Sequence, residues 1–161
     1  MKTRTCGSEI LLGLLSALLL MSPAPSVAAA QSNDDVRGAW TARRYILADG
    51  QDHNVRGQIF FAERDWQVLF FVMDETGTAR RGSGEGGTYE RTSDGVVFRH
   101  LLHLSVGDAM PGLAETPLRM VARGAEDAPL EPTRVDVEGD VLTLFFPSGN
   151  RMTFQRAVPE P

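Results

Sequence analysis

Residues 66–73 read Trp-Gln-Val-Leu-Phe-Phe-Val-Met and form the clearest strand in the sequence. The stretch is rich in β-branched and aromatic residues, and charged residues flank it at 63–65 and at Asp74. Its eight residues are too few for a buried helix, so this composition and length predict a β-strand. Side chains alternate between the two faces of a strand. Both faces of this one are apolar: Trp66, Val68, Phe70 and Val72 share one, and Leu69, Phe71 and Met73 share the other.

A strand with two apolar faces needs cover on both sides, since an antiparallel sheet ordinarily exposes one polar face to water. Residues 141–146 show the same two-sided pattern. Two interpretations follow. Either these strands are well buried in a small domain, or one of their faces lines an apolar pocket or a dimer interface.

Further strands are predicted on both sides of 66–73 by the same alternation, separated by turn residues at intervals of about 8–12 residues. They span 40–47, 57–62, 87–92, 96–106, 118–123, 134–137, 141–146 and 151–156. The segments 74–86 and 107–117 are predicted as long loops, and Ser93-Asp94-Gly95 as a type I′ turn. Apolar helical spacing and internal repeats are absent from the sequence. The pattern predicts an all-β fold, a single antiparallel up-and-down β-barrel of about eight or nine strands.

Composition agrees with one globular domain. The chain has 161 residues, of which 42% are hydrophobic and 23% charged, and its formal net charge is −5. A negative net charge argues against a nucleic-acid-binding protein with a broad basic face.

The first thirty residues have the pattern of a secretory signal peptide. Lys2 and Arg4 precede a twelve-residue apolar run at 10–21, and three alanines at 28–30 offer a cleavage site. The run is shorter than the roughly 20 residues of a membrane span. We therefore expect cleavage before Gln31 and a periplasmic or secreted protein. Residues 31–37 are then a flexible N-terminal arm, 38–157 the barrel, and 158–161 a frayed tail.

Covalent cross-links and several kinds of chemistry are excluded after residue 30. The single cysteine, Cys6, lies before that point, so no disulfide or thiolate is available. All fourteen cationic side chains that follow are arginines, which excludes Schiff-base formation by lysine. The domain must be held together by its core, and a chain of this length is large enough to form one.

A Gly-x-Trp motif, Gly38-Ala39-Trp40, opens the first predicted strand, and Arg156 ends the last. This pair resembles the closing latch of lipocalin-like, or calycin-type, barrels, in particular the short bacterial secreted forms. The resemblance implies that Trp40 plugs the closed end of the barrel while the Arg156 guanidinium stacks on its ring. It assigns Gly38, Trp40 and Arg156 a structural role.

Three histidines are candidates for chemistry. His100 and His103 lie three apart on one strand, so they point to opposite faces and cannot share a metal without a bulge. His100 falls on the face of Phe98, Leu102 and Leu104, which predicts an interior or rim histidine. The alternative is a haem ligand, as in some lipocalin-like barrels. His53 is expected in a solvated turn.

Catalytic motifs are not found. The glycine-rich segment 82–86 has neither the spacing of a nucleophile elbow nor the helix and lysine of a phosphate loop. We expect no enzyme activity, no cofactor and no metal site. Arg80 and Arg81 serve either solubility or an anionic partner, and the loop 110–113 either caps the barrel mouth or packs on the core.

Two functions fit this sequence. The first is a binding protein that holds a small apolar molecule in the barrel, with Phe70, Phe98 and Leu102 as the wall and His100 as the polar group that orients the ligand. The second is a protein-interaction module of the cell envelope, an assembly factor or a hydrolase inhibitor, that uses its loops or the arm 31–37. An open cavity favours the first and a filled barrel the second. The oligomeric state is left open.

Overall fold

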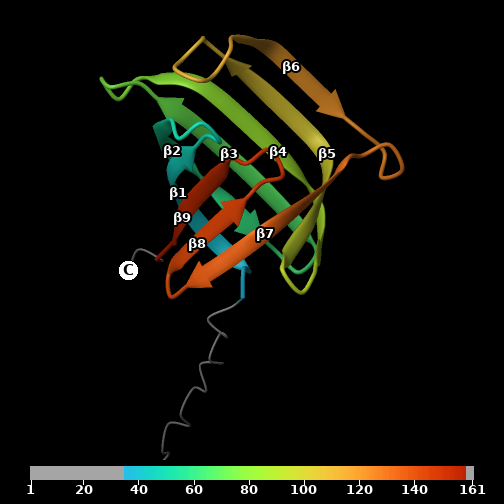
Figure 1. Ribbon diagram of the computed structural model, residues 1–161. Coiled ribbons are helices and arrows are strands. Elements are labelled where there is room, and N and C mark those ends of the chain that lie inside the picture. The colour runs from blue at the N-terminus through green and yellow to red at the C-terminus, as the bar shows by residue number, and fades with distance from the viewer. Residues whose placement is uncertain (1–34, 159–161) are drawn as a thin grey trace, which may run out of the picture. The chain divides into compact units, whose positions relative to one another are not determined.

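The computed structural model describes residues 35–158, and it contains nine strands in that range. The elements are β1 (Gly38–Ile46), β2 (Asp52–Phe61), β3 (Asp65–Met73), β4 (Ala79–Arg91), β5 (Gly95–Gly107), β6 (Thr116–Ala122), β7 (Leu130–Glu138), β8 (Val141–Phe145) and β9 (Arg151–Arg156) (Figure 1). The predicted all-β class is confirmed. The predicted signal peptide and the arm up to residue 34 lie outside the described residues, as do residues 159–161.

The strands close into an antiparallel barrel. Hydrogen-bonded neighbours follow the order β4-β3-β2-β1-β9-β8-β7-β5, and β4 pairs with β5 to complete a ring of eight strands. β5 is long enough to pair with β7 along its first half and with β6 along its second half, so β6 lies outside the ring. The up-and-down barrel expected from the lipocalin-like resemblance is therefore present, with one extra strand (Figure 1).

The segment 74–86 is not the loop that the sequence predicted. β4 begins at Ala79 and pairs with β3 and β5 along its length, so the predicted strand 87–92 is only its second half. Glycine-rich composition concealed this strand, because glycine lowers strand propensity but fits a strand that neighbours pair on both sides. The type I′ turn at 93–95 is also wrong, since no described non-glycine residue has a positive φ.

The N-terminal half of β2 was likewise missed, and with it the place of His53. This residue lies within the strand and is buried, with Nε2 3.0 Å from the carbonyl oxygen of Pro111. It is not the solvated turn residue that the sequence predicted. Polar residues Asp52 and Asn54 flank it and gave that stretch the appearance of a turn.

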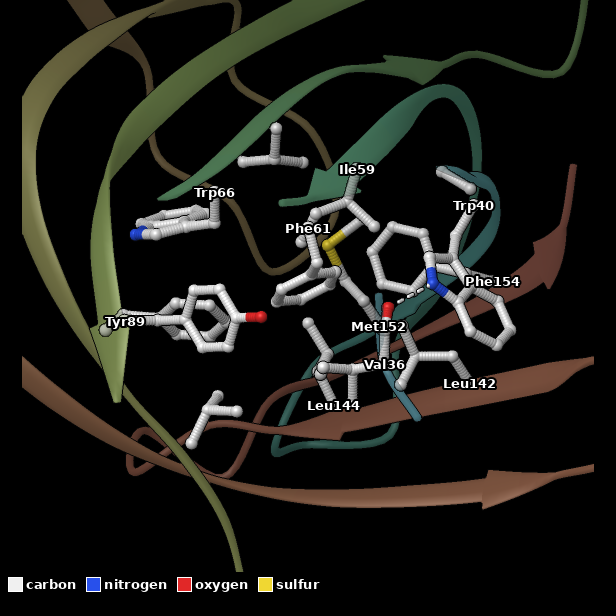
Figure 2. Packing of buried hydrophobic residues seen from close by; sticks show 14 of the residues in the cluster. Val36, Trp40, Ile59, Phe61, Trp66, Tyr89, Leu142, Leu144, Met152 and Phe154 are labelled. Carbon is white, nitrogen blue, oxygen red and sulfur yellow. Dashed lines mark hydrogen bonds between the residues drawn. The ribbon is translucent and has the colours of Figure 1, made fainter. Parts of the chain in front are cut away.

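Aromatic and aliphatic side chains from most strands of the ring fill the barrel interior. The fully buried ones are Trp40, Phe98, Phe154, Ile59, Leu142, Leu144 and Val96. Figure 2 labels five of them: Trp40, Phe154, Ile59, Leu142 and Leu144. Trp40 lies at one end of this cluster, where its indole Nε1 donates a hydrogen bond of 2.7 Å to the Val36 carbonyl oxygen. Asp35 and Val36 are themselves buried, so the last residues of the arm pack onto the barrel.

No helix in the part of the chain that the structure describes is long and apolar enough to cross a membrane.

Candidate functional site

A β-bulge in β5 determines where the histidines point. Gly87 of β4 pairs with His100, and the adjacent Gly86 pairs with Leu102, so Leu101 has no opposite residue. Gly87 is required at this step because a Cβ there would lie 2.0 Å from the Arg99 carbonyl oxygen. The extra residue reverses which side chains face inward along the second half of the strand.

As a result, His100 and His103 lie on the same side of β5. Both contact the Glu85 side chain of β4. The prediction that the two histidines point to opposite faces is wrong, because it assumed an unbroken strand. The same reversal turns Leu102 and Leu104 outward, and 55% of Leu102 is exposed to solvent.

The ring of His100 is held between two carboxylates. Its Nδ1 lies 2.5 Å from Oε2 of Glu85, and its Nε2 lies 3.1 Å from Oε2 of Glu131 on β7. His103 completes the group, with Nδ1 3.3 Å from Glu85 Oε1 and Nε2 3.0 Å from the Ser105 hydroxyl. We call Glu85, His100, His103 and Glu131 the acidic cluster.

Contacts within the acidic cluster shift the pKa values of His100 and Glu85. Burial alone would lower the pKa of His100, but the hydrogen bonds to Glu131 and Glu85 outweigh burial and raise the pKa to about 9. Burial opposes ionisation of Glu85 as well, yet its contacts with the two histidines hold its pKa below the usual value. His100 is therefore an imidazolium at neutral pH, and both of its ring nitrogens donate hydrogen bonds.

A cavity of about 160 Å³ opens beside this cluster within the barrel. Its walls are aromatic and aliphatic with a few polar groups: Tyr45, Ile59, Trp66, Val68, Phe70, Glu85, Phe98, His100, Glu131, Leu144, Phe146, Ser148, Asn150 and Met152. Of the four predicted ligand-binding residues, Phe70, Phe98 and His100 line the cavity. Leu102 does not, because the bulge turns it to the outer face of the barrel.

Trp66 contributes its ring to the cavity wall, and its indole N–H has no hydrogen-bond partner. Its ring packs on Phe98, with centroids 4.3 Å apart, and meets the His100 ring edge-on at 5.1 Å. Its indole Nε1 is buried without a hydrogen-bond partner, and no other side-chain polar atom among the described residues is in that state. A buried donor left unpaired costs about 1–3 kcal/mol of stability.

Three residues of the cavity wall, Glu85, Glu131 and Asn150, were not predicted from the sequence. Glu85 stands among glycines in the segment predicted as a loop. Glu131 lies in the stretch Pro-Leu-Glu-Pro at 129–132, just before the predicted strand 134–137. Asn150 lies in a turn, where its side-chain amide donates a hydrogen bond of 2.8 Å to the Tyr45 hydroxyl. The two glutamates could have been found as single acidic residues at inward positions of strands. That signal can be used only where the strand itself has been predicted correctly.

A haem does not fit this site. Both ring nitrogens of His100 are engaged by carboxylates, so neither is free to bind iron. The cavity is also smaller than the roughly 300–1,000 Å³ typical of pockets for drug-sized ligands. Among the described residues, moreover, the His, Asp and Glu side chains form no group of three arranged to hold a metal.

The remaining candidates serve the structure of the loop after β5. Met110 and Leu113 pack against the core and exchange backbone hydrogen bonds, so this loop is packed on the core rather than extended. Arg81 donates hydrogen bonds to the carbonyl oxygens of Asp108 and Ala114 and, at 2.8 Å, to the Thr116 hydroxyl. Arg80 pairs with the Asp108 carboxylate at 2.6 Å.

Comparison with known proteins gives one structural match. No family model matches the chain, and no curated protein does. A solved structure described as a lipocalin-like protein from Bacteroides uniformis matches with 16% sequence identity and a TM-score of 0.40, over 75% of this chain and 97% of that one. The strand order of the ring stands independently of this match, and it defines a closed antiparallel barrel of eight strands with one extra strand.

Proposed function

We propose that this protein binds a small molecule inside the barrel, with an apolar body against Trp66, Phe70 and Phe98 and a polar group at the acidic cluster. The observation that carries the proposal is the cavity in which aromatic rings and a buried charged group meet. Pockets of this composition, mostly apolar with a few placed polar groups, are typical of small-ligand sites.

The volume limits the size of the ligand. A dry apolar cavity of about 150 Å³ accommodates a molecule the size of benzene, and the cavity here is about 160 Å³. The ligand is therefore comparable to a single substituted ring. This is smaller than the carrier cargo that an open barrel would accept, because large core side chains such as Trp40, Phe154 and Leu142 fill the rest of the interior.

Charge limits the chemistry of the ligand. The cavity wall itself carries two carboxylates, Glu85 and Glu131, beside the one imidazolium of His100. A neutral hydrogen-bonding group or a cation is favoured here, and a ligand carboxylate is disfavoured by like-charge repulsion at short range.

Three probes of the same size test this proposal: benzyl alcohol, benzylamine and benzoate, each titrated by calorimetry. We expect measurable binding of the alcohol or the amine, and weaker binding of benzoate. Binding of benzoate above both others would contradict the assigned charge, and no binding of any probe would contradict the site.

A matched pair of variants locates the binding. Phe70→Trp introduces extra volume into the cavity wall and should weaken probe binding. Leu102→Trp adds a tryptophan on the outer face and should leave it unchanged. Equal effects of the two variants would show that the probes bind elsewhere.

We further propose that the protein acts in the periplasm or as a secreted protein, and as a binding protein rather than an enzyme. The leader-like composition of residues 1–30 supports the compartment. N-terminal sequencing of protein taken from the producing cells tests it, with a start near Gln31 expected and an intact Met1 contradicting it.

Four residues of the loops assigned to the alternative, an envelope interaction module, make contacts within the molecule, and most of the arm 31–37 assigned to it lies outside the described residues. Arg81 is bound to its own loop, Arg80 pairs with Asp108, and Met110 and Leu113 pack on the core.

A further inference from the structure

The outer surface of β3 to β6 is apolar over several strands. Leu69 and Phe71, Leu102, Leu104 and Val106, and Leu118 and Met120 are each 41–70% exposed. The adjoining Phe60 of β2 is exposed to a similar degree. These eight side chains, with the three glycines of β4 that lie among them, Gly82, Gly84 and Gly86, are called the outer apolar face.

Strand register makes this face continuous. Phe71, Gly82 and Val106 lie on one cross-strand row. The next row contains Leu69, Gly84, Leu104 and Met120, and the third contains Gln67, Gly86, Leu102 and Ala122. None of these residues from β3 to β6 is charged, and Gln67 is the one polar side chain among them. On β2 the three rows end at Arg56, Gln58 and Phe60. Figure 1 shows these strands side by side as one curved sheet.

The β4 glycines leave space in the middle of the face that β3 side chains cover. The ring of Phe71 lies 3.3 Å from where a Cβ of Gly82 would be, and Leu69 Cδ1 lies 3.6 Å from the corresponding point at Gly84. The apolar side chains of β3 therefore extend over the glycines of β4. An apolar sheet surface can pack against another sheet, about 10 Å away.

The exposed area matches what a stable dimer requires. Taking about 200 Å² for a fully exposed large apolar side chain, the eight side chains leave roughly 800 Å² accessible. Apolar patches on monomers usually reach only about 300–600 Å². Standard protein interfaces bury about 800 Å² on each partner.

We propose that the outer apolar face is covered by the same face of a second copy, forming a symmetric dimer by sheet-on-sheet packing. The lack of charge from β3 to β6 gives no basis for recognising a charged partner, whereas an identical apolar surface matches it in both area and chemistry. A two-fold axis brings the same patch together from both subunits. The proposal is independent of the ligand site, because the face lies on the opposite side of the sheet from the cavity.

Sedimentation velocity of the purified protein, measured over a wide range of concentration, tests the proposal. We expect a dimer in the wild type. Leu104→Arg places a charge in the middle row and should give a monomer. Met120→Arg, at a more exposed position on β6, should do the same without disturbing the fold, which circular dichroism would verify.

Val141→Arg is the matched control, since Val141 is as exposed as Leu104 but lies on β8, away from the outer apolar face. It should remain dimeric. A monomeric wild type at all concentrations would overturn the proposal, as would dissociation by Val141→Arg to the same extent. A monomer that co-sediments with lipid vesicles would instead assign the face to a membrane surface.

Discussion

The guanidinium carbon of Arg156 lies 4.0 Å from the centroid of the Trp40 indole ring. The two residues belong to paired strands, β1 and β9, and stand directly opposite each other in the register. Arg156 also donates hydrogen bonds of 3.3 Å to the carbonyl oxygens of Arg37 and Asp35. The contact thus ties the residues that precede β1 to the strand that closes the barrel.

Trp40 and Arg156 should therefore be energetically coupled. Trp40→Ala empties a fully buried site and should lower the free energy of unfolding by about 3–5 kcal/mol. Arg156→Ala should cost less, and the double variant should lose less than the sum of the two, because each single change already removes the shared contact. Denaturant unfolding of the four proteins measures this.

Arg134 supplies the control for that cycle. Its guanidinium lies over the Phe145 ring at 3.6 Å, a similar stacked geometry away from Trp40. Combining Arg134→Ala with Trp40→Ala should give additive losses. Additivity in the Arg156 cycle as well would show that the latch carries no coupling energy.

The strands with regular apolar alternation could be predicted from the sequence. The two-sided apolar stretch 66–73 falls within β3, and the periodic stretches 141–146 and 151–156 coincide closely with β8 and β9. Apolar alternation identifies such strands because one face of each must be buried. Closure of the ring followed from the short turns and from the Gly38-Ala39-Trp40 and Arg156 pair.

The candidate site could be predicted only in part, because it depends on the β-bulge in β5, which interrupts the alternation of inward and outward side chains. Phe70, Phe98 and His100 were placed correctly in the cavity wall, since they precede the bulge or lie on another strand. Leu102 was not, since a single extra residue at Leu101 reverses every later position. The bulge depends on backbone clearance at Gly87, which the sequence of β5 does not show.

Gly87 should accordingly tolerate substitution far less than Gly84, which lies three residues earlier on β4. A Cβ at Gly87 meets the Arg99 carbonyl oxygen at 2.0 Å, whereas at Gly84 it meets Leu69 Cδ1 at an ordinary 3.6 Å. Gly87→Ala should destabilise the protein by about 2 kcal/mol or more, and Gly84→Ala by less than about 1 kcal/mol. Thermal unfolding compares them, and equal losses would contradict the close approach.

Arg81 should control the order of the loop after β5. Its three hydrogen bonds reach Asp108, Ala114 and Thr116, whereas Arg80 makes only an exposed ion pair with Asp108. Arg81→Ala should increase hydrogen exchange at the Met110 and Leu113 amides, which are bonded to each other's carbonyl oxygens. Arg80→Ala should change these rates little, because exposed pairs contribute about 0–1 kcal/mol. Unchanged protection in Arg81→Ala would show that core packing alone holds the loop.

Stability should decrease as the pH is raised from about 6.5 to about 9. The pKa of His100 is raised from its usual 6.5 to about 9 by hydrogen bonds that outweigh its burial. The protonated ring therefore stabilises the folded state fully below pH 6.5, and this contribution is lost as the pH rises through the folded value. The loss is at most about 3 kcal/mol. Glu85 acts in the opposite direction, because its lowered pKa gives stability that is lost as the pH falls below its usual range.

Chemical denaturation at a series of pH values measures this loss, and two histidine variants assign it. His100→Gln keeps hydrogen bonding but cannot be charged, so it should be less stable at neutral pH and show a much flatter profile between pH 6.5 and 9. His53→Gln should retain the wild-type slope, because His53 bonds the Pro111 carbonyl oxygen and neither carboxylate of the acidic cluster. A wild-type profile that is flat in this window would show that the folded protein does not hold His100 as a cation. The ranking of benzoate against benzyl alcohol and benzylamine is a second test of the charges at the acidic cluster.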